Sequence, residues 1–390
     1  MLERLDEGAR FSPPYSLHEK IDVCRGLFAA LVVVAHSFDL ARFLDPSWDA
    51  GMPKLAADFL LCAAGTGVYY VMGFFILSGY CIQASARRLS DGPRFPLGAY
   101  ALARATRILP LYYAALLFAV AVEAVARPSG WRPDLWPAGF DARTLAWQSL
   151  LAQGVTGTFG SFVASWSITN EAAYYVLFGL VAAACAPLRA RPAVVGMALC
   201  CGGGAALLAA YRLTHDPRAM TWGLLVGLGA IWHLGALVEA YAPWIAARPR
   251  IGSIARIWPA VLALDMGLFV ARAVHQEVVF VLAGAAFALM MARFVAVDAA
   301  RGGPSAPPRA LPTALGMASY PMYLFHGPLL VAFGTAANAL GVAAPWWAIW
   351  PAASALAIAA CLPLGRLLEA PVMAWRAGLL KSASRRVARP

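Results

Sequence analysis

Charged residues are scarce in this sequence. Only 13% of its 390 residues are charged and 61% are hydrophobic, whereas a soluble domain carries about 25% charged residues. This shortage excludes an ordinary water-soluble fold. The sequence also lacks the alternation of polar and apolar residues over ~10 positions that is typical of membrane β-strands. The remaining class is an all-α membrane protein.

Several signatures of soluble enzymes are missing. The chain has no glycine-rich phosphate loop, no G-x-S-x-G turn and no spacing typical of metal ligands, so we predict no metal. Its seven cysteines lie mostly inside apolar runs, which favours packing roles over disulfides or ligands. The net charge of +11 is common in proteins that bind nucleic acid. We favour the ordinary excess of arginine in cytoplasmic loops and predict no nucleic-acid partner.

Apolar runs of about 18–24 residues recur along the chain, and a helix of that length crosses the ~30 Å hydrocarbon core of a bilayer. We therefore predict a polytopic protein with about ten transmembrane helices. Their approximate cores are 23–43, 57–83, 108–126, 170–187, 193–211, 221–240, 257–273, 278–296, 314–336 and 345–365.

Arginine and lysine are distributed unevenly between the connecting segments. The richer segments alternate with the poorer ones, and both ends of the chain are basic, so we place both termini in the cytoplasm. The predicted organisation is a cytoplasmic segment (1–22), one transmembrane domain (23–370) and a basic cytoplasmic tail (371–390). No cleavage pattern follows the first apolar run, which we expect to remain as an anchor. The abundance of alanine and arginine indicates a bacterial source, and hence the inner membrane.

The longest predicted connection, 127–169, is rich in proline and glycine and contains a mixed stretch from Leu145 to Val163. We interpret this stretch as a re-entrant or interfacial segment. Irregular backbone is tolerated at membrane depth only where protein or a water-filled cavity covers it.

Ionisable residues within the first predicted span carry the strongest functional signal. Arg25 and His36 are eleven residues apart, so they share one helical face with a rise of roughly 16 Å between them. Asp39 follows His36 at i+3, where its carboxylate can orient the imidazole. A histidine held in this way suits a general base or proton carrier. The alternative is that Arg25 marks the membrane rim and His36 forms a packing hydrogen bond.

Two further polar groups lie near the ends of spans. Arg104 and Arg107, at i and i+3, suit an anionic group such as the phosphates of a nucleotide carrier, although arginines at this position are also typical of cytoplasmic rims. Glu171 lies where a span begins on the outer side. Its alternative role is that of an acid favoured by the helix dipole.

A third group lies in the ninth predicted span. Tyr320, Tyr323 and His326 repeat at i, i+3 and i+6 and share roughly one face, with Ser319 beside them. This pattern fits either a ligand site or an aromatic stripe that packs against neighbouring helices.

Six segments that contain these groups occur in a fixed order. They are Arg25 and His36 separated by ten residues; Phe74-Phe75-Ile76-Leu77-Ser78-Gly79-Tyr80; Arg104-Ala105-Thr106-Arg107-Ile108-Leu109-Pro110-Leu111-Tyr112; Trp166-Ser167 followed by Glu171; Leu315-Gly316 through Ser319-Tyr320, Tyr323-Leu324 and His326; and Leu368-Glu369-Ala370-Pro371. Together they resemble the motifs of the acyltransferase-3 family of membrane acyltransferases, over nearly the whole chain. The sequence departs from the family pattern at Val71-Met72-Gly73, where an acid often precedes the phenylalanine pair, at Ala103 and at Asn170.

The resemblance implies transfer of an acyl group, commonly acetyl, from cytoplasmic acyl-CoA to a hydroxyl of a sugar, polysaccharide or lipid-linked glycan. His36 is then expected to act as a base or a transient acyl carrier. On this basis we assign catalysis to His36, Arg25 and Glu171, orientation to Asp39, Trp166 and Ser167, and donor binding to Arg104, Arg107, Tyr112, Ser78, Ser319, Tyr320, Tyr323 and His326.

Two other classes have similar composition. A transporter or flippase of a glycolipid or small anionic solute also has about ten spans and buried ionisable residues, but it is expected to show half-repeats and interrupted helices that this sequence lacks. A purely structural membrane subunit has no need of Arg25, His36 and Glu171 in apolar surroundings.

Overall fold

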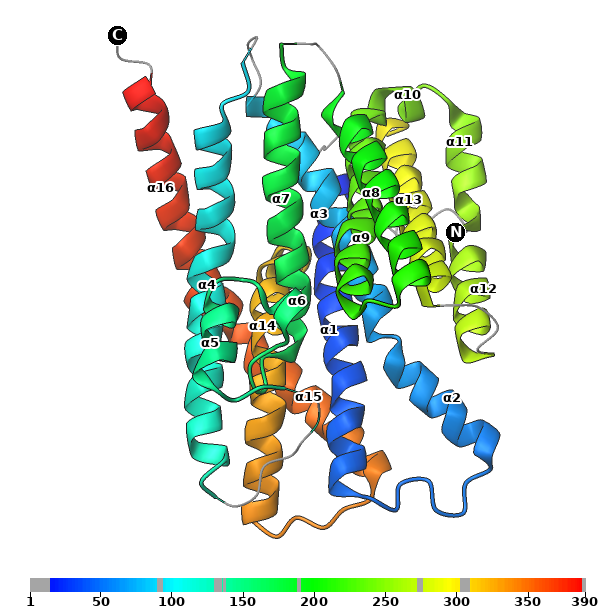
Figure 1. Ribbon diagram of the computed structural model, residues 1–390, viewed down its shortest axis with the longest axis vertical. Helices are drawn as coiled ribbons and strands as arrows, with labels where there is room; N and C mark the ends of the chain where they lie inside the picture. Colours follow the sequence, from blue (N-terminus) through cyan, green and yellow to red (C-terminus); the bar gives the residue numbers. More distant parts are fainter. Residues whose placement is uncertain are drawn as a thin grey trace, which may run out of the picture.

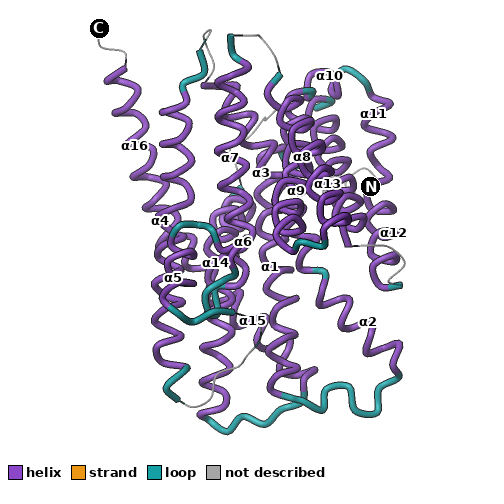
Figure 2. The backbone as a smooth tube through the Cα atoms, in the orientation of Figure 1, coloured by secondary structure: helices purple, strands orange, loops and turns teal. Residues whose placement is uncertain are grey.

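The computed structural model describes residues 15–387, apart from 90–93, 130–134, 136–137, 188–190, 272–275 and 302–308. Most of the predicted N-terminal segment and the last three residues of the predicted tail lie outside the described residues. Figures 1 and 2 show a bundle of helices joined by short loops. In the described part of the chain the only bridge of the β type is isolated and joins Gly139 to Phe159.

The helices follow one another in this order: α1 (Leu17–Leu44), α2 (Lys54–Gly65), α3 (Gly67–Leu89), α4 (Leu97–Ala126), α5 (Ala142–Ser149), α6 (Gln153–Thr156), η1 (Val163–Ser165), α7 (Trp166–Cys185), α8 (Pro192–Thr214), α9 (Pro217–Ala240), α10 (Ala242–Ala246), α11 (Pro249–Ile254), η2 (Ala255–Ile257), α12 (Trp258–Val270), α13 (Gln276–Ala299), α14 (Ala310–Ala339), α15 (Trp346–Leu364), η3 (Gly365–Glu369) and α16 (Ala370–Val387).

Long apolar helices dominate the structure. Within the described residues, nine helical segments are long and apolar enough to cross a membrane. The 30-residue helix α14 is also long enough to cross a membrane, but it contains Pro321 and Pro328 and carries polar residues that include His326. It packs along α1 inside the bundle (Figure 1). The prediction of an all-α, multi-pass membrane protein is therefore confirmed.

Helices α1 and α14 run in the same direction and pack closely through glycine. A methyl group added to Gly26 would lie 2.7 Å from Leu315 Cβ, and one added to Gly316 would lie 2.5 Å from the carboxyl carbon of Asp22. Small residues let membrane helices approach in this way. Because the two helices run in parallel, residues about ten positions further along each of them also meet.

Helices α3 and α9 form a second close pair. A Cβ on Gly79 would lie 1.9 Å from the carbonyl oxygen of Trp232, and one on Gly235 would lie 2.0 Å from that of Ile76. The backbones therefore touch where only glycine fits. This contact brings the Trp232 side chain beside Ser78, the residue that precedes Gly79.

The connection between α4 and α7 folds back into the bundle. The Tyr112 hydroxyl of α4 donates to the Gln148 carbonyl oxygen at 2.6 Å, and the Gln148 side-chain amide donates to Ser165 Oγ at 2.9 Å. The Gln153 amide donates to the Ser165 carbonyl oxygen at 2.7 Å. Gln148 and Ser165 are fully buried. Tyr112 and Gln153 thereby satisfy backbone carbonyl groups of this connection inside the protein, and the re-entrant or interfacial placement of the segment stays a prediction.

Candidate active site

Two cavities lie along α1, one near each end of the helix. We call the first the arginine cavity. It measures about 320 Å³, and its polar lining comprises Arg25, Ser78, Cys81, Ser85, Arg88, Arg104, Arg107, Ser167, Glu171, Tyr175, Ser319, Tyr320, Tyr323 and Arg376. We call the second the histidine cavity. It measures about 300 Å³, and its polar lining comprises His36, Asp39, Arg42, Trp166 and Tyr323.

The arginine cavity carries a strong excess of positive charge. Five arginines line it, and Glu171 is its only acidic lining residue. Arg104 donates to Ser85 Oγ at 3.1 Å and lies over the Tyr100 ring at 5.7 Å. These contacts hold the guanidinium in place without neutralising it, so its charge is available to an anionic ligand.

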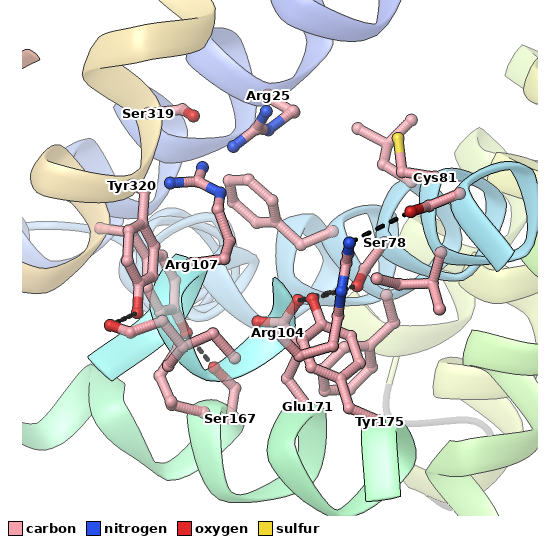
Figure 3. A pocket seen from close by; sticks show the side chains of 18 of the residues that line it. Arg25, Ser78, Cys81, Arg104, Arg107, Ser167, Glu171, Tyr175, Ser319 and Tyr320 are labelled. Atoms are coloured by element: carbon pink, nitrogen blue, oxygen red, sulfur yellow. Dashed lines mark hydrogen bonds between the residues drawn. The ribbon is translucent and has the colours of Figure 1, made fainter. Parts of the chain in front are cut away.

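Arg107 is held more tightly. Its guanidinium forms an ion pair with Glu369, which is buried, and lies 5.2 Å from the centre of the Tyr320 ring. The side chains of Arg25 and Arg107 approach the same space beside Tyr320 (Figure 3). The structure thus places Arg25, which the resemblance assigned to catalysis, on the same cavity wall as Arg107 and Tyr320, which it assigned to donor binding.

Arg376 of α16 also lines the arginine cavity, although sequence reasoning does not distinguish it from the other basic residues of the tail. Helix α16 packs along α4, and Arg376 Nε donates to the Ala103 carbonyl oxygen at 3.2 Å. The predicted tail therefore begins as a helix that returns to the cavity. Its position depends on the π-helical turn η3, which joins it to α15.

Glu171 lies in a hydrogen-bonded network on the opposite wall (Figure 3). Ser78 Oγ donates to Glu171 Oε1 at 2.7 Å, and the Tyr175 hydroxyl donates to the same oxygen. Trp232 Nε1 donates to Ser78 Oγ at 3.1 Å. The network thus brings together Ser78, expected to bind the donor, and Glu171, expected to take part in catalysis. Tyr175 and Trp232 complete the network: Tyr175 follows Glu171 at i+4 on α7, and the close approach of α3 and α9 brings in Trp232.

The histidine cavity is built around a pair of imidazoles. His36 Nδ1 lies 2.8 Å from His326 Nε2, and the rings are nearly parallel, with 5.0 Å between their centres. Asp39 also lines this cavity and pairs with Arg42 at 2.7 Å. Trp166 forms part of the same lining. The structure therefore places His326 beside His36, whereas the sequence pattern had grouped it with Tyr320 and Tyr323.

A thin partition separates the two cavities. Val71 and Tyr323 line both of them. The Tyr323 hydroxyl donates to the Ala164 carbonyl oxygen at 2.9 Å and lies 2.7 Å from Ser167 Oγ. Its ring packs edge-on against Phe74, with 5.5 Å between ring centres.

The remaining predicted residues lie at different distances from the cavities. Ser319 lines the arginine cavity and donates to the Gly316 carbonyl oxygen at 2.6 Å. The Tyr320 hydroxyl donates to the Ile108 carbonyl oxygen at 3.1 Å. Tyr112 is fully buried and holds the re-entrant segment instead of lining either cavity.

Two positions where the sequence departs from the family pattern have local explanations. A Cβ on Gly73 would lie 2.5 Å from the Phe28 ring, so the absence of a side chain there lets α1 pack against α3. The buried Asn170 amide donates to the Tyr174 hydroxyl at 3.1 Å. Its polar group is therefore satisfied inside the bundle.

A family model described as an acyltransferase domain matches residues 18–366. The chain belongs to the acyltransferase-3 family. No curated protein and no solved structure matches the chain. Family membership confirms the resemblance found in the sequence and makes the chain a membrane acyltransferase, which sets aside the transporter and structural-subunit alternatives. In this acyltransferase-3 protein five of the six family segments contribute residues to the two cavities, and the sixth contributes Glu369, which pairs with Arg107.

Proposed function

We propose that this acyltransferase-3 protein transfers an acyl group, commonly acetyl, from acyl-CoA to a hydroxyl of a sugar, polysaccharide or lipid-linked glycan. In this proposal the arginine cavity binds the donor and the histidine cavity receives the acceptor. The observation that carries it is the contact of a cationic cavity with a histidine-lined cavity across the side chains of Val71 and Tyr323. Such a pair of compartments provides separate places for an anionic carrier and an acceptor alcohol.

The donor assignment is supported by charge. Acyl-CoA carries several phosphate oxygens, and arginine binds phosphate through charge-assisted, often bidentate hydrogen bonds. Arg25, Arg104 and Arg376 line the cavity from three different helices, α1, α4 and α16. A cavity of about 320 Å³ lies within the range of small-molecule sites and accommodates part of such a ligand.

The chemistry is assigned to His36. In the first route, the neutral imidazole takes the proton of the acceptor hydroxyl, the oxygen attacks the thioester carbonyl, and the C–S bond breaks to release the CoA thiolate, which recovers the proton from the imidazolium. In the second route, the imidazole nitrogen itself attacks the thioester, and the C–S bond breaks to release the CoA thiolate. The acceptor hydroxyl then displaces the acyl group from the acyl-imidazole, and its proton passes to the freed imidazole nitrogen and from there to the thiolate. Both routes form one ester and release one CoA thiol.

Glu171 is assigned a role on the donor side. Its carboxylate accepts hydrogen bonds from Ser78 and Tyr175, and these bonds fix its charge opposite the arginines. We propose that it positions the pantetheine arm and keeps the phosphates at the arginine end of the cavity. This role places Glu171 with the donor, together with Ser78, Ser167, Ser319 and Tyr320, which line the same cavity.

The proposed location is the inner membrane of a bacterium, with the arginine cavity open to the cytoplasm, where acyl-CoA is made. The positive-inside distribution of arginine supports this orientation. The histidine cavity then lies toward the opposite side, where surface glycans are assembled.

The function is tested by mass spectrometry of surface glycans from cells with and without the protein. We expect a mass increment of one acyl group that is lost in His36→Ala. His215→Asn, a substitution in the exposed loop after α8, is the matched control and should retain the increment. An unchanged increment in a normally expressed His36→Ala variant would overturn the proposal.

A further inference from the structure

The second imidazole beside His36 has no role in the reaction described so far. His326 lies on α14 and is fully buried. Its position follows from the parallel packing of α1 and α14, in which His36 and His326 each lie ten residues beyond the glycine contacts of Gly26 and Gly316. The helix pair therefore fixes the spacing of the two rings independently of any substrate.

The hydrogen bonds of His326 determine where its proton lies. His326 Nδ1 is 3.0 Å from the carbonyl oxygen of Met322, one turn earlier on α14. A carbonyl oxygen only accepts hydrogen bonds, so Nδ1 must carry a hydrogen. In a neutral imidazole the other nitrogen, Nε2, is then an acceptor. A neutral ring is expected because His326 has no exposed surface, and a charged ring there would lose its hydration.

The proton on His36 follows from the same reasoning. His36 Nδ1 lies 2.8 Å from His326 Nε2. Since His326 Nε2 accepts, His36 Nδ1 must donate, and its hydrogen is used in that bond. The reverse assignment would place two lone pairs against each other at the Met322 carbonyl oxygen. The basic nitrogen of neutral His36 is therefore Nε2.

We infer that His326 is a positioning residue that fixes the tautomer and ring orientation of His36, so that Nε2 of His36 is the nitrogen that reacts. This inference rests on the proposed function of His36. It holds for both routes, since a base and a nucleophile each need a lone pair on the reacting nitrogen. It replaces the donor-binding role that the sequence pattern suggested for His326.

The test compares two polar substitutions that differ in one hydrogen bond. His326→Gln keeps an amide oxygen near the place of Nε2 and preserves an acceptor for His36. His326→Asn keeps a donor near the place of Nδ1, toward the Met322 carbonyl oxygen, but removes that acceptor. We expect His326→Asn to lower kcat roughly 10- to 100-fold, which is part of the 10²–10⁴ that a positioned base contributes, with KM for acyl-CoA unchanged. We expect His326→Gln to stay within about threefold of the parent kcat.

A merely structural role would lower thermal stability in both variants and would not separate their kcat values. Equal kcat in the two variants, or a parent-like kcat in His326→Asn, would overturn the inference. If His326→Asn does not fold, His326→Leu provides a second variant without the acceptor, and its kcat is compared with that of His326→Gln in the same way. Activity in His36→Ala would instead overturn the proposed function, so the two failures are distinguishable.

Discussion

The arginine cavity and the histidine cavity are almost equal in volume, about 320 and 300 Å³, but they are built from different interactions. The first is lined by guanidinium groups held by ion pairs, aromatic rings and single hydrogen bonds. The second has two stacked imidazoles, an ion pair at its side and a tryptophan. Positive charge suits the binding of a carrier that bears phosphates, whereas hydrogen bonds between neutral side chains suit proton transfer. Substitutions in the two cavities should therefore affect different kinetic constants.

Among substitutions that distinguish the two cavities, the largest effect, a rise in KM for acyl-CoA, is expected at Arg104. Arg104→Gln removes a guanidinium whose charge is not paired with an acid in any contact of the described residues. A hydrogen bond to a charged group contributes about 1.5–3 kcal/mol, so KM for acyl-CoA should rise roughly 10- to 100-fold while kcat changes little. Steady-state kinetics in detergent measures both constants. Arg256→Gln, at an exposed position, is the control, and a change confined to kcat would contradict the donor assignment.

Cys81 gives a direct report of occupancy in the arginine cavity. It is an exposed thiol in the cavity lining, one turn from Ser78. At a tenfold excess of acyl-CoA over its Kd, labelling by a maleimide should slow roughly tenfold because the free cavity is correspondingly depleted. The labelling that acyl-CoA slows should disappear in Cys81→Ser and remain in Cys201→Ser, which removes the other exposed thiol.

The same label tests the orientation of the membrane protein. An impermeant maleimide should reach Cys81 in inverted vesicles and not in intact cells. Labelling from the outer side, or labelling that acyl-CoA does not slow, would break the distinction between a cytoplasmic donor cavity and an opposite acceptor cavity.

A smaller effect is expected at the partition. Tyr323→Phe removes the hydroxyl that contacts Ala164 and Ser167. Loss of a partner by buried polar groups costs about 1–3 kcal/mol, so the partition should loosen, and CoA release without acceptor should rise a few-fold. Tyr69→Phe is the control, since the buried Tyr69 hydroxyl has no hydrogen-bond partner among the described residues. An equal response in both variants would show that Tyr323 does not separate the cavities.

The smallest effect is expected at Asp45, the C-cap residue of α1. Asp45 accepts hydrogen bonds from Ser47 Oγ at 2.7 Å and from the Trp346 amide at 3.0 Å, and these bonds hold its pKa below the ordinary value. The lowered pKa stabilises the fold above the ordinary pKa of about 3.9, and this contribution is lost as the pH falls through the lowered value.

Asp45→Asn should therefore lower Tm slightly near neutral pH, and the difference from the parent should vanish in strong acid. Thermal unfolding followed by tryptophan fluorescence across this pH range measures it. The exposed Asp49→Asn in the same loop serves as the control. A constant difference at every pH would show that the ionised carboxylate of Asp45 is not what stabilises the contact.

Much of the fold and part of the site could be predicted from the sequence. Apolar runs of 18–24 residues have the length of a helix that crosses the hydrocarbon core of a bilayer, so the helical class was predictable. The spacing of Arg25 and His36 was also informative, because helical geometry alone separates them along one face. The structure assigns Arg25 to the arginine cavity and His36 to the histidine cavity.

The rest of the site depends on contacts between helices, and the periodicity of a single helix does not predict these contacts. His326 shares a helical face with Tyr320 and Tyr323, and only the register of α14 against α1 brings it to His36. In the sequence Arg376 is one of several basic residues of the tail, and only the packing of α16 along α4 places it at the arginine cavity.

We propose that donor binding and acyl transfer occur in different cavities. Equilibrium binding of labelled acetyl-CoA to purified His36→Ala, followed by addition of acceptor, tests it most directly. We expect a Kd for acetyl-CoA within about twofold of the parent value, because Kd depends only on the arginine cavity. We also expect the rate of acyl transfer to fall about 10²- to 10⁴-fold. Loss of acetyl-CoA binding in His36→Ala, or transfer at the parent rate, would contradict it.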